Sequence, residues 1–238
     1  MIASWSMELP SYGELAKMID HSLLKPTLTR DELEAGCRLA IEYDVASVCI
    51  MPYYLARASE LLRGSSVLPT TTIGFPHGGQ STRVKQLEAD QALSDGAREL
   101  DMVVNISQVL SDDFEGVRTD ILAVLQPTHA RGQKLKVIFE NCYLNAEQKT
   151  RLCEICGELS VDWVKTSTGF GSSGATIDDL VLMRKNSPAH VQVKAAGGIQ
   201  TLDMLLKVRE AGATRSGCSK TGEVLTELRQ RLALRREA

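Results

Sequence analysis

The sequence predicts an α/β protein folded as a single (β/α)8 barrel, and three observations lead to this fold. Short strand-like runs alternate with amphipathic, helix-like stretches from end to end, eight such runs can be counted, and 238 residues suit one barrel. No G-x-G-x-x-G motif follows the first run and no Walker A motif occurs, so the common nucleotide-binding folds are not favoured. We predict one domain over residues 1–238, with residues 1–12 as an N-terminal arm that is mobile or contacts another subunit.

Runs of β-branched and apolar residues predict the strands. The first run is short, AKMIDHS at 16–22. The other seven runs are ASVCIM (46–51), TTTIGF (70–75), ELDMVVNI (99–106), LKVIFE (135–140), VDWVKTST (161–168), VQVKAA (191–196) and ATRSG (213–217). Because helix-like stretches separate them, we expect parallel strands joined by right-handed crossovers.

Capping signals mark the ends of the predicted helices. Thr29 precedes Glu32 by three residues, the spacing of a capping box, and Asn145 begins NAEQKTRLCEICGEL in the same way. Gly96 and Gly212 fall where helix C-termini favour glycine. Further helices are predicted in STRVKQLEADQALSDG, FEGVRTDILAVLQ, TIDDLVLMRKN, TLDMLLKVREAG and EVLTELRQRLALRR.

Composition and charge exclude several classes of function. The net charge of −3 does not favour binding to nucleic acid or to an acidic membrane, and no apolar run approaches the roughly 18 residues of a membrane span. The N-terminal residues lack the pattern of a signal peptide. Six dispersed cysteines are typical of reduced thiols, so we predict a cytoplasmic protein. Cys153 and Cys156 form a lone C-x-x-C inside a predicted helix, and the four histidines show no ligand spacing, so we predict no metal site.

Two lysines lie inside hydrophobic strand-like runs: Lys165 in VDWVKTSTGFG and Lys194 in VQVKAAGG. Burial, or a neighbouring cation, lowers the pKa of a lysine from about 10 toward neutrality. A neutral amine attacks carbonyl carbons to form Schiff bases. Either lysine taken singly is more simply a side chain that reaches solvent. Two of them on neighbouring predicted strands indicate carbonyl chemistry through an imine.

Polar and small residues follow these lysines at the predicted strand ends, where barrel enzymes bind substrate. Asp101 lies in ELDMVVNI, as a candidate for proton transfer or, equally, as a buried hydrogen-bonding carboxylate. Glycine-containing turns open toward the next helix after each of the last two strands, the usual place of a phosphate site. The residues of these strand ends are Thr166, Ser167, Thr168 and Gly169, then Gly197 and Gly198, then Gly217, Ser219 and Lys220. We therefore expect a phosphorylated carbonyl substrate.

Seven segments resemble the deoxyribose-phosphate aldolase family of class I aldolases. They are IDHSLLKPTLT, SVCIMP, TTIGFPHGG, GARELDMVVNIS, LKVIFENCYL, VDWVKTSTGFGSSGAT and VKAAGGIQT, and the similarity runs from about residue 15 to 222. The resemblance implies a (β/α)8 fold and reversible cleavage of 2-deoxy-D-ribose 5-phosphate to acetaldehyde and D-glyceraldehyde 3-phosphate. It also implies deoxynucleoside catabolism in the cytoplasm, no cofactor, no metal, and a homodimer or homotetramer that binds small sugar phosphates and aldehydes.

The resemblance also implies roles for individual residues. Lys165 corresponds to the Schiff-base lysine, Lys194 to the lysine whose charge keeps it deprotonated, and Asp101 to a residue that transfers protons. Asp20 supports the site, and Cys49 lies near it without a catalytic role. With Thr168 and Lys220 added from the strand-end residues themselves, the predicted substrate- and phosphate-binding set comprises Asp20, Thr168, Gly169, Gly197, Gly198, Gly217, Ser219 and Lys220.

Two of the departures from the family pattern concern the phosphate site. Gln200 stands where arginine is common, and Lys220 stands where serine or another small residue is usual. We hypothesise that Lys220 partly replaces the missing positive charge. The alternative is a Schiff-base aldolase of the same fold that acts on a different or non-phosphorylated aldehyde pair. A non-catalytic relative that binds a sugar phosphate is disfavoured because Asp101, Lys165 and Lys194 are all present.

Overall fold

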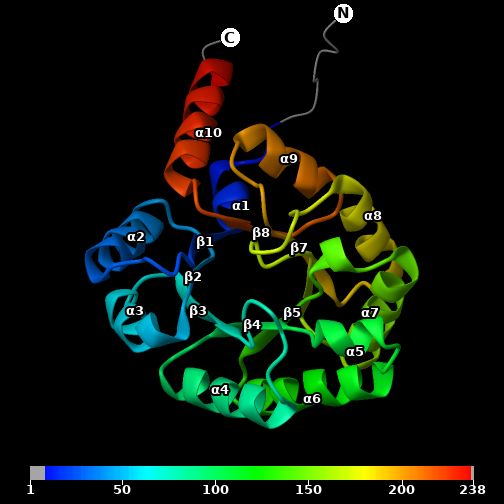
Figure 1. Cartoon of the computed structure of the whole chain (residues 1–238). Helices are drawn as coiled ribbons and strands as arrows, with labels where there is room; N and C mark the ends of the chain where they lie inside the picture. The colour runs from blue at the N-terminus through cyan, green and yellow to red at the C-terminus, as the bar shows by residue number, and fades with distance from the viewer. Residues whose placement is uncertain (1–8, 237–238) are drawn as a thin grey trace, which may run out of the picture.

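The computed structural model describes residues 9–236, which form a closed barrel of eight parallel strands (Figure 1). Each strand pairs with the next along the chain, and β8 pairs with β1. The strands are β1 (Ile19–Leu23), β2 (Ser47–Ile50), β3 (Leu68–Ile73), β4 (Glu99–Val103), β5 (Lys134–Ile138), β6 (Trp163–Lys165), β7 (Gln192–Ala195) and β8 (Arg215–Cys218). The predicted barrel is confirmed, and each strand overlaps its predicted run.

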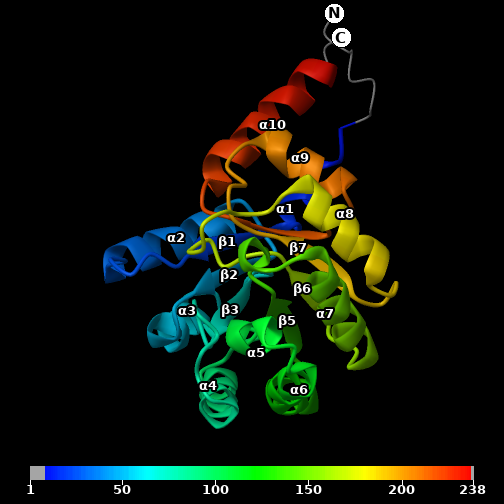
Figure 2. The same cartoon turned by 45° about the vertical axis from the view of Figure 1, so that its right-hand side comes forward.

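Helices surround the barrel on its outer side (Figure 2). They are α1 (Tyr12–Ala16), α2 (Arg30–Glu42), α3 (Leu55–Leu61), α4 (Thr82–Ser94), α5 (Ile106–Leu110), α6 (Phe114–Ala130), α7 (Ala146–Glu158), α8 (Ile177–Asn186), α9 (Leu202–Glu210) and α10 (Thr221–Arg236), with 3-10 turns η1 (Pro52–Tyr54) and η2 (Asn141–Tyr143). The capping boxes at Thr29 and Asn145 are both present. Gly96 and Gly212 follow α4 and α9 with φ of 103° and 99°, as expected for helix C-termini.

Three local features differ from the sequence-based expectations. The strand expected over 99–106 ends at Val103, because Asn105 caps α5 by accepting from the backbone N–H of Gln108. Helix α3 has no counterpart among the predicted helices. Ser11 caps α1 and the Tyr12 hydroxyl donates to the carbonyl of Tyr43, so the chain joins the fold from Ser11 onward. Residues 1–8 of the predicted arm lie outside the described residues, and the single-domain assignment over 1–238 stays a prediction.

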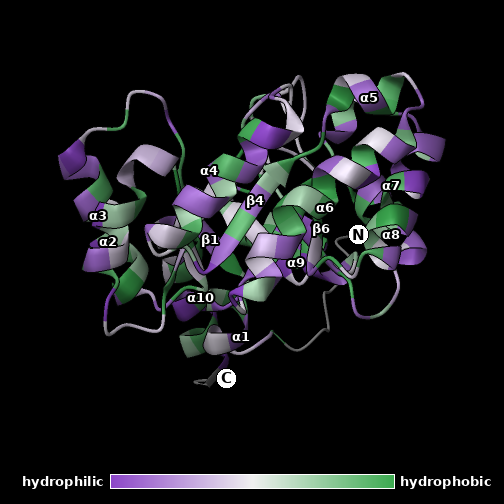
Figure 3. Ribbon diagram, turned by 90° about the horizontal axis from the view of Figure 1, so that it is seen from below, coloured by the Kyte–Doolittle hydropathy of each residue, from purple (hydrophilic) through white to green (hydrophobic). Residues whose placement is uncertain are grey.

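Along the strands, successive side chains point alternately into the apolar layer beneath the helices and into the polar interior of the barrel. Leu100 and Met102 of β4 are buried in the hydrophobic core, whereas Glu99 and Asp101 alternate with them and bond to charged side chains of other strands. The helices carry both hydrophobic and hydrophilic residues, as expected where one face packs on the barrel (Figure 3). No helix among residues 9–236 is long and apolar enough to cross a bilayer.

Candidate active site

The barrel interior holds a network of seven buried charged side chains, which we call the ionic network. Barrels of this type usually fill this space with bulky branched apolar residues. The members are Asp20 on β1, Glu99 and Asp101 on β4, Lys136 on β5, Lys165 on β6, Lys194 on β7 and Arg215 on β8, all at most 8% exposed. Burying so many charges costs free energy that packing alone would not require, so the network indicates a chemical role.

Lys165 and Lys194 lie side by side at the centre of this network. They are paired in register on the neighbouring strands β6 and β7. Both ammonium groups donate to the same oxygen, Oδ2 of Asp101, and each N–O distance is 2.7 Å. The two lysines and Asp101, all singled out in the sequence, are therefore brought into direct contact.

Asp20 holds the far side of Lys194. Its Oδ2 accepts from the Lys194 ammonium at 2.5 Å. Its Oδ1 accepts from Nη1 of Arg215 at 2.6 Å and from the Ser47 hydroxyl at 2.7 Å. Lys194 thus bridges Asp20 and Asp101, which fixes its ammonium group beside Lys165.

Three members of the ionic network are absent from the site predicted by sequence: Glu99, Lys136 and Arg215. The Lys136 ammonium donates to Glu99 and, at 2.9 Å, to Oδ1 of Asp101. Arg215 donates to both oxygens of Glu99 at 3.0 and 3.1 Å, and its guanidinium lies 4.8 Å from the centroid of the Trp163 ring. The sequence contained a signal that could have identified them, because each of the three is a charged residue inside a strand-like run.

The number of charges in the ionic network indicates which amine loses its proton most readily. Fully ionised, the network has four cations and three carboxylates, so it balances only if one amine loses its proton. Within the described residues Lys165 contacts one carboxylate, whereas Lys194 contacts two and Lys136 contacts three. Deprotonating Lys165 therefore breaks the fewest ion pairs.

The directions in which the pKa values of the two lysines are shifted agree with this count of ion pairs. Burial lowers the pKa of Lys165, and the charge of Lys194 lowers it further against the opposing effect of Asp101. Burial also disfavours the charged form of Lys194, but Asp101 and Asp20 outweigh it and raise its pKa. Although burial would raise it, the surrounding lysines hold the pKa of Asp101 below its usual range. Of the two lysines that contact Asp101, Lys165 is therefore the one that loses its proton more readily.

Glycine turns follow β6 and β7, whereas Gly217, which was predicted for a turn after the last strand, lies within β8. Gly169, Gly197 and Gly198 have φ of 90°, 83° and 84°, values that residues other than glycine rarely adopt. A Cβ on Gly197 would lie 2.7 Å from the Cα of Gly174, so the two turns pack backbone to backbone. The N–H of Ala175 donates to the carbonyl of Gly197 at 3.2 Å, which joins the segments.

Comparison with known proteins places this arrangement in a family. A family model described as "DeoC/LacD family aldolase" matches residues 15–224, nearly the whole of the chain and every strand of the barrel.
The chain belongs to the DeoC/LacD aldolase family.
The resemblance seen in the sequence is thereby confirmed at the level of the family, and a buried lysine whose pKa is lowered suits the chemistry of a class I aldolase.

Individual relatives of this aldolase agree with the family match. A deoxyribose-phosphate aldolase of Rhodopirellula baltica is 60% identical over 223 residues, covering 94% of this chain and 92% of the relative. One from Thermococcus kodakarensis is 47% identical over 208 residues, with 87% and 93% covered. A solved tetrameric deoxyribose phosphate aldolase from Aeropyrum pernix superposes with a TM-score of 0.85 at 29% identity, covering 93% of both chains.

Other residues predicted for the site of this aldolase lie outside the ionic network. Lys220 is half-exposed and pairs with Glu223 of α10 at 2.7 Å, and together with Ser219 it lines a hollow beside α2. Gln200 is exposed. The Thr168 hydroxyl donates to the Glu140 carboxylate. The structure thus gathers Asp20, Asp101 and the two lysines without bringing Lys220 or Gln200 to them.

Cys49 is buried near the lysines, and burial raises the pKa of its thiol to about 11. The thiol therefore stays protonated at neutral pH and is a poor nucleophile, in agreement with the non-catalytic place expected for it.

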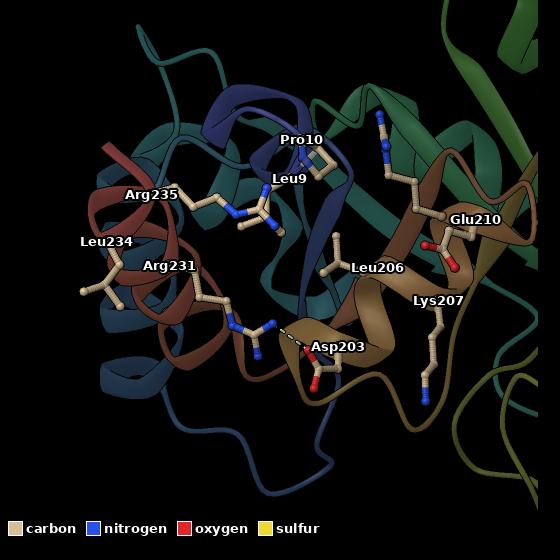
Figure 4. A pocket seen from close by; sticks show the side chains of 10 residues that line it. Leu9, Pro10, Asp203, Leu206, Lys207, Glu210, Arg231, Leu234 and Arg235 are labelled. Atoms are coloured by element: carbon tan, nitrogen blue, oxygen red, sulfur yellow. Dashed lines mark hydrogen bonds and ion pairs between the residues drawn. The ribbon is translucent and has the colours of Figure 1, made fainter. Parts of the chain in front are cut away.

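A separate surface cavity lies between α9, α10 and the start of the described chain (Figure 4). Its lining includes Leu9, Pro10 and Leu206, and the ion pair of Asp203 with Arg231, 2.7 Å long, spans the two helices. None of its lining residues belongs to the ionic network.

Proposed function

We propose that this aldolase cleaves 2-deoxy-D-ribose 5-phosphate reversibly to acetaldehyde and D-glyceraldehyde 3-phosphate through an imine on Lys165. The observation that carries the proposal is the charge balance of the ionic network, which is reached when Lys165 is neutral. The deoxyribose-phosphate aldolases that resemble the chain over most of its length support the choice of substrate.

The proposed reaction begins with attack of the neutral Lys165 Nζ on the aldehyde carbon C1 of the open-chain sugar. The carbonyl oxygen takes up protons and leaves as water, which produces an iminium ion. We assign these proton transfers to Asp101 and Lys194, because Asp101 lies 2.7 Å from both lysine nitrogens. The iminium restores the positive charge next to Asp101, which stabilises it electrostatically.

Carbon–carbon cleavage follows from the electron demand of the iminium. The electron pair of the C2–C3 bond moves into the iminium and forms an enamine. At the same time the C3 hydroxyl loses its proton, and C3 becomes the aldehyde carbon of glyceraldehyde 3-phosphate. The enamine is then protonated at C2, and hydrolysis of the imine releases acetaldehyde and the free amine of Lys165.

The activity is tested by measuring both products from deoxyribose 5-phosphate. Equal amounts of acetaldehyde and glyceraldehyde 3-phosphate are expected from the wild type, and none from Lys165→Met. Lys85→Met is a matched control, because Lys85 is also fully buried but pairs with Asp120 outside the barrel interior. Product formation that survives in Lys165→Met would exclude Lys165 as the nucleophile.

For the phosphate we propose the turns that contain Gly169, Gly197 and Gly198, together with Gly217 of β8 and Ser219 just after it; Thr168 is assigned to the rest of the substrate. Lys220 would add a positive charge only after leaving Glu223. Lys220→Ala should therefore raise KM for deoxyribose 5-phosphate but not for deoxyribose, and Glu223→Gln should lower it. An unchanged KM in Lys220→Ala would reject the hypothesis that Lys220 replaces the positive charge that is missing at Gln200.

A second candidate function is favoured by the same ion pair. Since Lys220 is engaged by Glu223 and Gln200 carries no charge, an aldolase acting on a non-phosphorylated aldehyde pair also fits the site. Higher kcat/KM for deoxyribose than for deoxyribose 5-phosphate would favour this second function.

We also propose a cytoplasmic homodimer or homotetramer that needs no metal or cofactor and binds neither nucleic acid nor membranes. The tetrameric relative from Aeropyrum pernix supports self-association, and the six free cysteines suit a reducing compartment. Light scattering of the purified protein gives the subunit number, and activity measured after dialysis against a chelator tests the need for a metal.

A further inference from the structure

Glu140 is a buried acidic residue that the proposed reaction does not use. It follows β5 at the end of the barrel where Lys165 ends β6, and the residue is only 2% exposed. Its backbone adopts the left-handed conformation, with φ of 58°. Both features cost free energy, since a buried carboxylate is desolvated and a residue with a Cβ is disfavoured at this φ. A buried carboxylate in a disfavoured backbone conformation at the mouth of an active site indicates a functional constraint.

The Glu140 carboxylate binds the turn that follows Lys165. The backbone N–H of Thr168 donates to Oε1 and Oε2 of Glu140 at 3.2 and 3.3 Å, and the Thr168 hydroxyl donates to Oε2. Within residues 9–236 these partners are neutral groups, and no ion pair involving Glu140 is formed. The chain then folds back over the carboxylate, because a Cβ on Gly171 would lie 3.1 Å from the Glu140 Cδ.

These contacts determine the hydrogen-bonding direction of the Thr168 hydroxyl. A carboxylate has only acceptors, so the single proton of the hydroxyl must point at Glu140. The Thr168 oxygen also accepts from the N–H of Phe170 at 3.0 Å. One acceptor lone pair is left on this oxygen and no donor.

We propose that Glu140 is a positioning residue that turns Thr168 into an obligatory acceptor for a hydroxyl group of the substrate. Thr168 lies three residues after Lys165, and a sugar bound as an imine carries hydroxyls on the carbons next to the cleaved bond. Such a hydroxyl can donate to the free lone pair of the Thr168 oxygen, whereas a carbonyl or ether oxygen at the same place cannot. This inference rests on the proposed function and adds the residue that selects a hydroxylated substrate.

The test uses Glu140→Gln, Thr168→Val and the double variant in the full-length protein. The amide of a glutamine can donate as well as accept, so Glu140→Gln no longer forces the direction of the Thr168 proton. We expect kcat/KM for deoxyribose 5-phosphate cleavage to fall about tenfold or more in each single variant. Borohydride trapping of acetaldehyde on Lys165 should stay near the wild-type rate, because acetaldehyde has no hydroxyl.

The double variant separates a positioning role from a general loss of structure. If Glu140 acts through Thr168, Glu140→Gln should add little to the effect of Thr168→Val. Asp120→Asn is the matched control, since Asp120 is an equally buried carboxylate on α6 that pairs with Lys85. It should lower stability and leave both KM and kcat close to wild type.

Two results of the cleavage assay would overturn the inference. One is wild-type kcat/KM in Glu140→Gln, and the other is additive losses in the double variant. Equal losses of acetaldehyde trapping and of cleavage would also contradict it, because a merely structural defect affects both reactions. If the wild type itself fails to trap acetaldehyde on Lys165, the proposed function fails first, so the two failures are distinguishable.

Discussion

Replacing Lys194 by methionine should convert Lys165 from a nucleophile into an ion-pair partner. The ionic network has four cations and three carboxylates, so loss of Lys194 leaves three of each. Charge balance is then reached with Lys165 protonated. Methionine has a similar length and no charge, so the change removes the cation with little change in volume.

The size of the effect follows from the geometry. Both lysine nitrogens lie 2.7 Å from Oδ2 of Asp101, so their separation is at most twice that distance. Two unit charges at this separation repel by about 3 kcal/mol at an effective dielectric constant of about 20. Since about 1.4 kcal/mol corresponds to tenfold in an equilibrium, the neutral fraction of Lys165 falls by about a hundredfold at a pH below its pKa.

The assay is the rate of borohydride trapping with acetaldehyde as a function of pH. The rate should fall by about a hundredfold near neutrality in Lys194→Met, and its acid limb should move to higher pH, where the activity recovers. Lys194→Arg keeps the charge and should move the limb far less. An acid limb at the wild-type position in Lys194→Met would refute the electrostatic argument.

Three further predictions concern stability. Gly78→Ala should lower the free energy of unfolding in urea by at least about 2 kcal/mol. The reason is that φ of Gly78 is 68° and the new Cβ would lie 1.8 Å from the carbonyl oxygen of Val104. Wild-type stability in Gly78→Ala would contradict this close contact between the two backbone segments. Thr29→Ala should cost about 1 kcal/mol in the same measurement through loss of the α2 capping box, with Thr29→Ser as the control that keeps it. The third prediction concerns pH values between the lowered pKa of Lys165 in the folded protein and its usual value of about 10.4. In this range Lys165 is protonated in the unfolded chain but not in the folded one, so the free energy of unfolding should rise with pH. Lys165→Met should remove that slope.

The sequence predicted the barrel because its signals are local. Alternation of strand-like and helix-like segments and capping pairs such as Thr29 with Glu32 can be recognised without tertiary contacts. Lys165 and Lys194 could be recognised for a similar reason, since a charge inside an apolar run is unusual. The fold then followed from the number of segments.

The remaining site residues depend on contacts between distant strands. Glu99 and Arg215 are separated by 116 positions, and Glu140 and Thr168 by 28, so no local spacing connects either pair. Lys220 is a different case: it is a plausible phosphate ligand by position, yet it pairs with Glu223 only three residues later. Such choices are decided by tertiary packing and by competition between charges.

Of the buried amines in the barrel, we expect Lys165 alone to be neutral and nucleophilic. Peptide mapping after borohydride reduction of the wild-type enzyme with acetaldehyde tests this expectation most directly. We expect a reduced ethyl adduct on the peptide that contains Lys165 and none on Lys136 or Lys194. An adduct on Lys194, or no adduct on any of the three, would contradict it.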